Sequence, residues 1–202
     1  MVVAGFDPGG RGKNGIALIT DNEIFSATVK DARAALQWLR RRSKEKVVAI
    51  GVDTFLHWEF VDDRPCDAWL RRNYPAVRNS VMHVNSAMGS MVVQGVIFAI
   101  EARKIWPEVL LNETHPKVLH YAFTNRSIDY TQACLDAFGI LVEPDTEHAA
   151  DALIAAEITR RAISDPQDFC DLSKKASNPI FPAGKANYWW PRYAVGTSTA
   201  TR

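Results

Sequence analysis

Three short β-rich runs near the start of the chain constrain its fold most strongly. They are VVAGF (2–6), GIALIT (15–20) and EIFSATV (23–29), and only a glycine-rich segment and an Asp-Asn pair separate them. Short runs of branched and aromatic residues joined by such turns are typical of antiparallel strands. The sequence therefore begins with a predicted three-stranded meander.

Helices and strands alternate after the meander. Hydrophobic spacing, capping residues and stop signals predict helices over 31–42, 87–105, 129–139 and 145–164. Asp31 is the expected N-cap of the first helix, and Asp145 or Thr146 that of the last. A shorter helix is expected around CDAWLRR, within an otherwise irregular stretch from 54 to 79.

Two further apolar runs, 47–53 and 108–113, each end in an acidic residue. Continuous apolar runs of this length are typical of strands buried on both faces of a sheet. The resulting order, βββαβαβα with a further helix late in the chain, predicts an α/β fold. Its mixed sheet should carry helices on both faces.

A chain of 202 residues suits a single domain, which we expect to span 1–164. The segment 165–202 is then an extension that packs on the domain through the aromatic residues of 178–193 and ends in a loose tail (194–202). The composition, 47% hydrophobic and 23% charged, is that of a globular protein.

Composition also limits the setting and the partners. No run approaches the roughly 20 apolar residues that span a bilayer, and the N-terminus lacks the pattern of a signal peptide, so we expect a cytoplasmic protein that does not contact membranes. The three cysteines have no C-x-x-C spacing and indicate neither a disulfide framework nor a zinc site. A net charge of +1 is not the excess of a protein that coats nucleic acid. Trp58, Trp69 and the YWWP segment could supply a homodimer interface, although core packing explains these aromatic residues better.

Gly10, Gly12 and Gly15 match the G-x-G-x-x-G pattern of phosphate-binding loops. In a dinucleotide-binding protein the last glycine opens a helix, whereas Gly15 here opens an apolar run that reads as a strand. A protein kinase does place such a loop between strands, but its other motifs are missing, and so is the Walker spacing around Lys13. The glycines are better explained as a hairpin turn that leaves Asp7 open to solvent or ligand.

Four acids occupy corresponding places in the predicted fold. Asp7, Asp53 and Glu113 end three strands, and Asp151 lies early in the last helix. Because parallel strands bring their carboxyl ends to one edge of a sheet, we expect these side chains to converge. Clustered carboxylates repel one another unless a cation compensates them, and oxygen ligands suit Mg²⁺ or Mn²⁺.

A metal-dependent hydrolase follows from this arrangement. Two ions about 3.5–4 Å apart activate water and stabilise the leaving oxygen of a phosphodiester. Glu147, His148 and Asp151 share one face of the last helix, so His148 is a candidate ligand, proton shuttle or phosphate contact. A single acid at a strand end is more often a turn former or a cap; four corresponding acids favour a site.

The same residues carry a resemblance to a known superfamily. GFDPGGRGKNGIALI, AIGVD and EHAADALIAAEI resemble the ribonuclease H-like fold, and the last segment resembles the closing helix of RuvC-type Holliday junction resolvases. A widespread family of predicted ribonuclease H-like nucleases is more similar still, over most of residues 1–160. That similarity includes GVDTFLHW, CDAWLRR, NSAMGSM and NETHPKV.

The resemblance implies a nuclease with Asp7 as the central metal ligand. It makes Asp53, Glu113 and Asp151 the other ligands of Mg²⁺ or Mn²⁺, His148 a functional residue, and nucleic acid, DNA or RNA, the partner. The low net charge argues against four-way DNA as the substrate. Two alternatives remain: a binding protein of the same fold without catalysis, and an actin-like nucleotide-binding phosphotransferase, whose second lobe a chain of 202 residues does not accommodate.

Overall fold

The computed structural model describes residues 1–10, 12–60, 63–84, 89–130 and 132–192, without the side chains of Ala133 and Cys134. Residues 87–88 of the expected helix and the expected loose tail, 194–202, lie outside these ranges. The strands are β1 Val3–Asp7, β2 Asn14–Ile19, β3 Ile24–Val29, β4 Ala49–Val52, β5 Leu110–Glu113, β6 Phe169–Asp171 and β7 Trp189–Pro191. The α-helices are α1 Ala32–Arg42, α2 Pro65–Asn73, α3 Gly89–Ile105, α4 Pro116–Thr124, α5 Gln132–Asp136 and α6 Glu147–Ser164. Short 3₁₀ helices are η1 Pro75–Ser80, η2 Pro166–Asp168 and η3 Leu172–Lys175.

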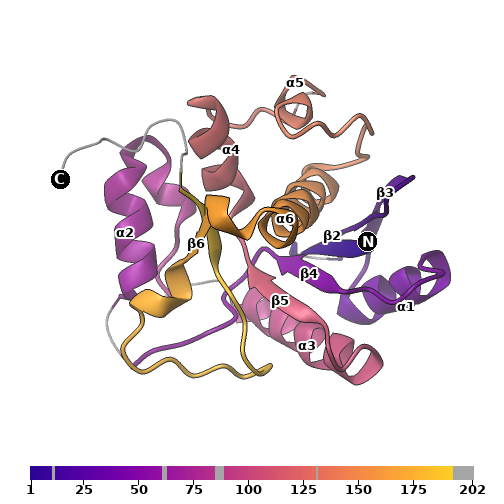
Figure 1. The fold of residues 1–202 in the computed structure, drawn as a ribbon, viewed down its shortest axis with the longest axis horizontal. Coiled ribbons are helices and arrows are strands. Elements are labelled where there is room, and N and C mark those ends of the chain that lie inside the picture. Colours follow the sequence, from indigo (N-terminus) through magenta and orange to yellow (C-terminus); the bar gives the residue numbers. More distant parts are fainter. Residues whose placement is uncertain (11, 61–62, 85–88, 131, 193–202) are drawn as a thin grey trace.

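A five-stranded mixed sheet occupies the centre of the molecule (Figure 1). Its strand order is β3-β2-β1-β4-β5. The first three strands pair antiparallel, and β4 lies parallel to both β1 and β5. The meander and the α/β class expected from the sequence are both confirmed.

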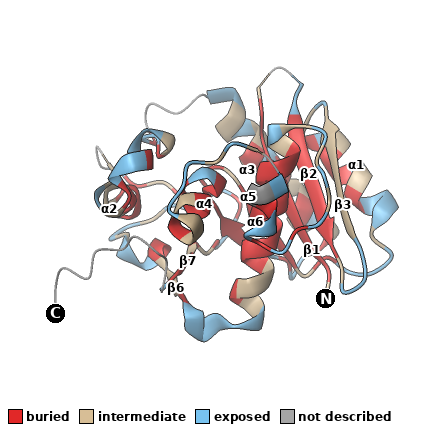
Figure 2. Cartoon of the chain, turned by 90° about the horizontal axis from the view of Figure 1, so that it is seen from above, coloured by how far each residue is buried: buried red, intermediate tan, exposed pale blue. Residues whose placement is uncertain are grey.

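Helices cover both faces of this sheet (Figure 1). Side chains alternate along a strand, so β2 directs Ala17 toward α6 and Ile16 toward α1 and α3. On the latter face Phe6 stacks on Phe98 of α3, with ring centroids 4.1 Å apart. Figure 2 shows the result, with β1, β2 and much of α6 buried.

Capping residues fix where the helices begin. The Asp31 carboxylate accepts a hydrogen bond from the Ala34 amide at 2.8 Å, which confirms the expected cap of α1. Of the two candidates for α6, Thr146 is the cap and accepts from the Ala149 amide at 3.2 Å. Helix α4 is not among the elements expected from the sequence. Its signals are proline at the first helical position and a left-handed Asn125 after the last.

The chain after α6 returns to the body of the protein. Strands β6 and β7 form a small antiparallel sheet, and the fully buried Trp190 indole donates to the Tyr74 hydroxyl at 2.9 Å. The Trp189 amide donates to the Asn112 side chain of β5, also at 2.9 Å. The domain boundary at residue 164 stays a prediction. Within the described ranges, none of the helices has both the length and the apolar character needed to span a bilayer.

Candidate metal centre

Three aspartates converge at the carboxyl edge of the sheet. Asp7 is the last residue of β1, Asp53 directly follows β4, and Asp151 lies in the second turn of α6. One carboxylate oxygen from each lies within 4.8 Å of the others. Asp7 and Asp151 are buried, whereas Asp53 is partly exposed. We call Asp7, Asp53 and Asp151 the three-aspartate site.

Parallel pairing and a close helix bring these carboxylates together. Strands β1 and β4 are parallel neighbours, and the Asp53 amide donates to the Phe6 carbonyl at 2.9 Å, so two of the acids leave the sheet side by side. Helix α6 approaches the sheet closely at two glycines, Gly5 and Gly15. A Cβ at Gly5 would overlap the backbone oxygen of Ala152, and a Cβ at Gly15 that of His148.

The glycine-rich turn has the structural role expected from the sequence. Gly12 has a φ of +77°, which favours glycine, and Gly15 lies inside β2 opposite Asp7. A helix therefore does not begin at Gly15. The third glycine of the G-x-G-x-x-G match permits the approach of α6 to the sheet.

Burial raises the pKa of all three carboxyl groups, and repulsion by neighbouring aspartates adds to this at Asp53 and Asp151. Desolvation is the largest cause in each case, and it raises the pKa of Asp151 to about 8 with the help of Asp7. The pKa of Asp53 is raised well above its ordinary value by burial and by Asp7 and Asp151, and that of Asp7 is raised by burial. A cation bound among the carboxylates would offset the free-energy cost of ionising them.

The donor set fits a hard divalent cation. All three side chains offer carboxylate oxygens, the ligands that Mg²⁺ and Mn²⁺ prefer. Asp151 Oδ1 is buried and has no hydrogen-bond partner among the described residues. Such an orphaned oxygen is costly in a folded protein unless something binds it.

His148, Tyr130 and Lys117 interact with the three-aspartate site through hydrogen bonds or charge. His148 Nδ1 lies 2.7 Å from Asp7 Oδ2, and this hydrogen bond raises the pKa of His148. The Tyr130 hydroxyl donates to Asp151 Oδ2 at 2.9 Å. Lys117, exposed at the start of α4, lowers the pKa of all three aspartates through its charge. Tyr130 and Lys117 were not predicted from the sequence. Pro116, which marks the start of α4, could have indicated that Lys117 lies at a helix start.

Glu113 lies in a second, fully buried cluster. It ends β5, as the sequence predicts, but Arg64 Nη2 donates to its Oε1 at 2.5 Å and the Leu56 amide to its Oε2 at 2.8 Å. Arg64 Nε also donates to Asp67 Oδ2 at 2.6 Å. Burial would raise the pKa of Glu113, but Arg64 and His57 outweigh it and hold that pKa below its usual range.

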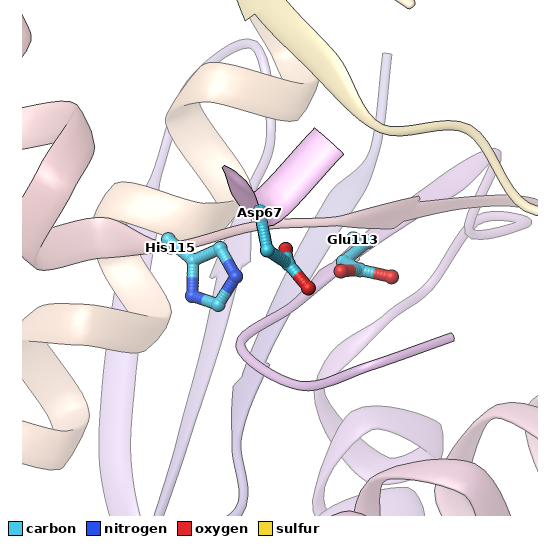
Figure 3. A group of neighbouring side chains, drawn as sticks. All are labelled: Asp67, Glu113 and His115. Carbon is cyan, nitrogen blue, oxygen red and sulfur yellow. The ribbon is translucent and has the colours of Figure 1, made fainter. Parts of the chain in front are cut away.

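Figure 3 shows Glu113 with Asp67 and His115, the three side chains of this cluster whose ligand atoms lie within 4.8 Å of one another. His115 reaches toward the three-aspartate site, since its Nδ1 is 3.8 Å from Asp53 Oδ1. The structure thus brings Asp7, Asp53 and Asp151 together, and His148 is hydrogen-bonded to Asp7. Glu113 is instead paired with Arg64. The ligand and catalytic roles of all five residues stay predictions.

No protein-family model matches the sequence, and no curated protein matches it. Among solved structures, the Thermus thermophilus RuvC structure is similar, with 17% sequence identity and a TM-score of 0.43 over 78% of this chain and 92% of that chain. The order β3-β2-β1-β4-β5, with β4 and β5 parallel to β1, forms one mixed sheet with helices on both faces, as expected from the sequence. The molecule is an α/β protein with a three-aspartate site at the carboxyl edge of its mixed sheet.

Proposed function

We propose that the protein is a divalent-metal-dependent nuclease whose three-aspartate site hydrolyses phosphodiester bonds. The observation that carries the proposal is the convergence of Asp7, Asp53 and Asp151 from two strands and a helix, with one buried oxygen of Asp151 unpartnered. Structural sites rarely gather three carboxylates against desolvation without a cation to compensate them.

The residues around the site have separate roles in this proposal. Asp7, Asp53 and Asp151 hold one or two Mg²⁺ or Mn²⁺ ions. When bound, such an ion supplies Lewis acidity to the phosphate and lowers the pKa of the attacking water. Tyr130 fixes the Asp151 carboxylate through its hydroxyl, and Lys117 offers an exposed ammonium to the phosphate backbone. His148 holds a proton at Nδ1 against Asp7 and orients that carboxylate.

In this proposal Glu113 supports the site without binding the metal. Both of its oxygens already accept hydrogen bonds, from Arg64 and from the Leu56 amide. A carboxylate engaged in this way is compensated by a cation of the protein itself. We therefore propose that the three aspartates bind the metal and that Glu113 fixes the position of Arg64.

Asp7→Asn tests the proposal directly. Purified protein should cleave DNA or RNA with Mg²⁺ or Mn²⁺ and not with EDTA. Changes to groups that merely support metal ligands already cost about 10–100-fold. Loss of the ligand Asp7 should therefore lower kcat at least about 100-fold and weaken Mn²⁺ binding measured by calorimetry.

Asp168→Asn is the matched control, because Asp168 is exposed on η2. It should leave cleavage and Mn²⁺ binding unchanged. Full turnover by Asp7→Asn, or in EDTA, would remove the site assignment. Nucleic acid binding that is insensitive to EDTA and to Asp7→Asn, without cleavage of any form, would instead favour a non-catalytic binding protein.

A further inference from the structure

A pocket of about 320 Å³ opens beside the three-aspartate site. Its lining includes the polar Asp53, His115 and Lys117 and the apolar Phe55 and Val92. Asp53 therefore belongs both to the pocket and to the three-aspartate site, and the charge of Lys117 acts on all three aspartates. A molecule bound at the carboxylates would extend directly into this pocket.

The apolar wall is built from side chains that keep polar atoms away from the ligand. Met82 follows η1, Met91 and Val92 lie on α3, and these three line the pocket together with the buried Phe55. Methionine side chains are polarisable and adapt to flat aromatic surfaces. These walls suit a planar ring better than a sugar or a chain of charges.

The second buried cluster keeps this wall rigid. The guanidinium of Arg64 lies over the Phe55 ring, 4.5 Å from its centroid, and His115 meets the same ring edge-on at 6.1 Å. Arg64 is itself fixed by hydrogen bonds to Glu113 and Asp67. The cluster that takes up Glu113 thus fixes one wall of the pocket before any ligand arrives, which lowers the entropic cost of binding.

The rim supplies groups that can read the edge of a heterocycle. Asn79 and Ser80 of η1 line the pocket, and their side chains offer both donors and acceptors. A volume of about 320 Å³ lies at the lower end of the range for small-ligand pockets. It is suited to one base rather than to a base pair.

We propose that this pocket binds a single unpaired nucleobase of the strand whose neighbouring phosphate lies at the three-aspartate site. The inference rests on the proposed nuclease function and narrows its substrate. A base held in a pocket lined by Phe55 and the methionines cannot pair with a complementary strand, so the substrate is single-stranded or locally unpaired at the cleaved position. Pockets of this kind stack a base between apolar side chains and read its edge by hydrogen bonds.

Val92→Trp tests the pocket, with Val93→Trp as its matched control. Val92 lines the pocket, whereas Val93 is the next residue of α3 and is 55% exposed. The substrates are a single-stranded oligonucleotide and copies in which one base is removed at successive positions. Stacking of one base is worth roughly tenfold or more in affinity.

With the wild type and Val93→Trp, kcat/KM should fall about tenfold or more at the phosphate next to the missing base. Val92→Trp should cleave the intact strand about tenfold or more slowly and should no longer respond to the missing base. Equal cleavage of intact and base-free strands by the wild type, or wild-type behaviour of Val92→Trp, would overturn the pocket assignment. Melting temperatures check that both variants fold.

A binding experiment separates failure of the pocket from failure of the proposed function. A strand carrying 2-aminopurine is titrated with protein in Ca²⁺, and the fluorescence of that base is followed. A change with the wild type and Val93→Trp, but not with Val92→Trp, supports the pocket even if no cleavage is found. No fluorescence change at any labelled position overturns it even if the protein cleaves nucleic acid.

Discussion

Glu113 differs from the three aspartates because a cation of the protein itself neutralises its charge. Its carboxylate lies near Asp53 and contributes to that residue's raised pKa, yet it is neutralised by Arg64. Removing one member of a buried ion pair typically costs 3–5 kcal/mol, because the partner charge is left uncompensated. Arg64 keeps Asp67 as a second partner, which moderates the loss.

Glu113→Gln should therefore lower the free energy of unfolding by about 3 kcal/mol, measured by urea denaturation. Its Mn²⁺ affinity, corrected for unfolded protein, should match that of the wild type, whereas Asp53→Asn should weaken Mn²⁺ binding. Glu108→Gln, at an exposed position, should stay within about 0.5 kcal/mol of the wild type. Weaker Mn²⁺ binding by a folded Glu113→Gln would make Glu113 a fourth ligand.

At the scale of elements, the site depends on how closely α6 lies on the sheet. The contact at Gly5 leaves no room for a methyl group, because its place is taken by the backbone oxygen of Ala152 on α6. Ala152 directly follows Asp151 in the chain. Any shift of the helix away from β1 therefore moves a carboxylate of the three-aspartate site.

Gly5→Ala should destabilise the protein by about 1–3 kcal/mol, the usual cost of overpacking a core. It should also weaken Mn²⁺ binding, because Asp151 moves away from Asp7 and Asp53. Gly10→Ala is the control, since a Cβ at Gly10 meets nothing within 4 Å. Thermal melts and calorimetry measure both effects. Wild-type Mn²⁺ affinity in a destabilised Gly5→Ala would show that the site tolerates movement of the helix.

The elements also show what could be predicted from the sequence. The meander, α1 and α6 have strong local signals in the sequence. The strand-end position of Asp7 and Asp53 was sufficient to predict that their side chains converge. Strand-end position does not say which partner a carboxylate takes. Arg64 lies in an irregular stretch 49 residues from Glu113, and no spacing rule connects them. Their ion pair depends on tertiary packing, so it could not be predicted.

Across the whole molecule, two apolar cores on opposite faces of the sheet supply stability that offsets the free-energy cost of gathering the aspartates at its edge. The fold keeps Asp7 and Asp151 buried although burial raises the pKa of both. Stability given up at a site in this way indicates a group retained for binding or catalysis. That cost should be visible in the dependence of stability on pH.

A carboxyl group whose pKa is raised on folding stabilises the folded state fully below its unfolded pKa, and this contribution is lost as pH rises toward the folded pKa. For Asp151 the window runs from the ordinary value of 3.8 to about 8. Asp7 and Asp53 shift in the same direction. Glu113 shifts the opposite way, so its contribution is lost only on acidification below its ordinary value of 4.5.

In EDTA, the melting temperature of the wild type should therefore fall between about pH 5 and pH 8, and that of Asp151→Asn should fall less, because asparagine has no proton to release. Asp168→Asn should follow the wild type. Mg²⁺ at pH 8 should raise the melting temperature of the wild type by mass action and that of Asp151→Asn much less. Parallel curves for the wild type and Asp151→Asn would mean that Asp151 carries no electrostatic cost, and the case for a compensating cation would lose its physical basis.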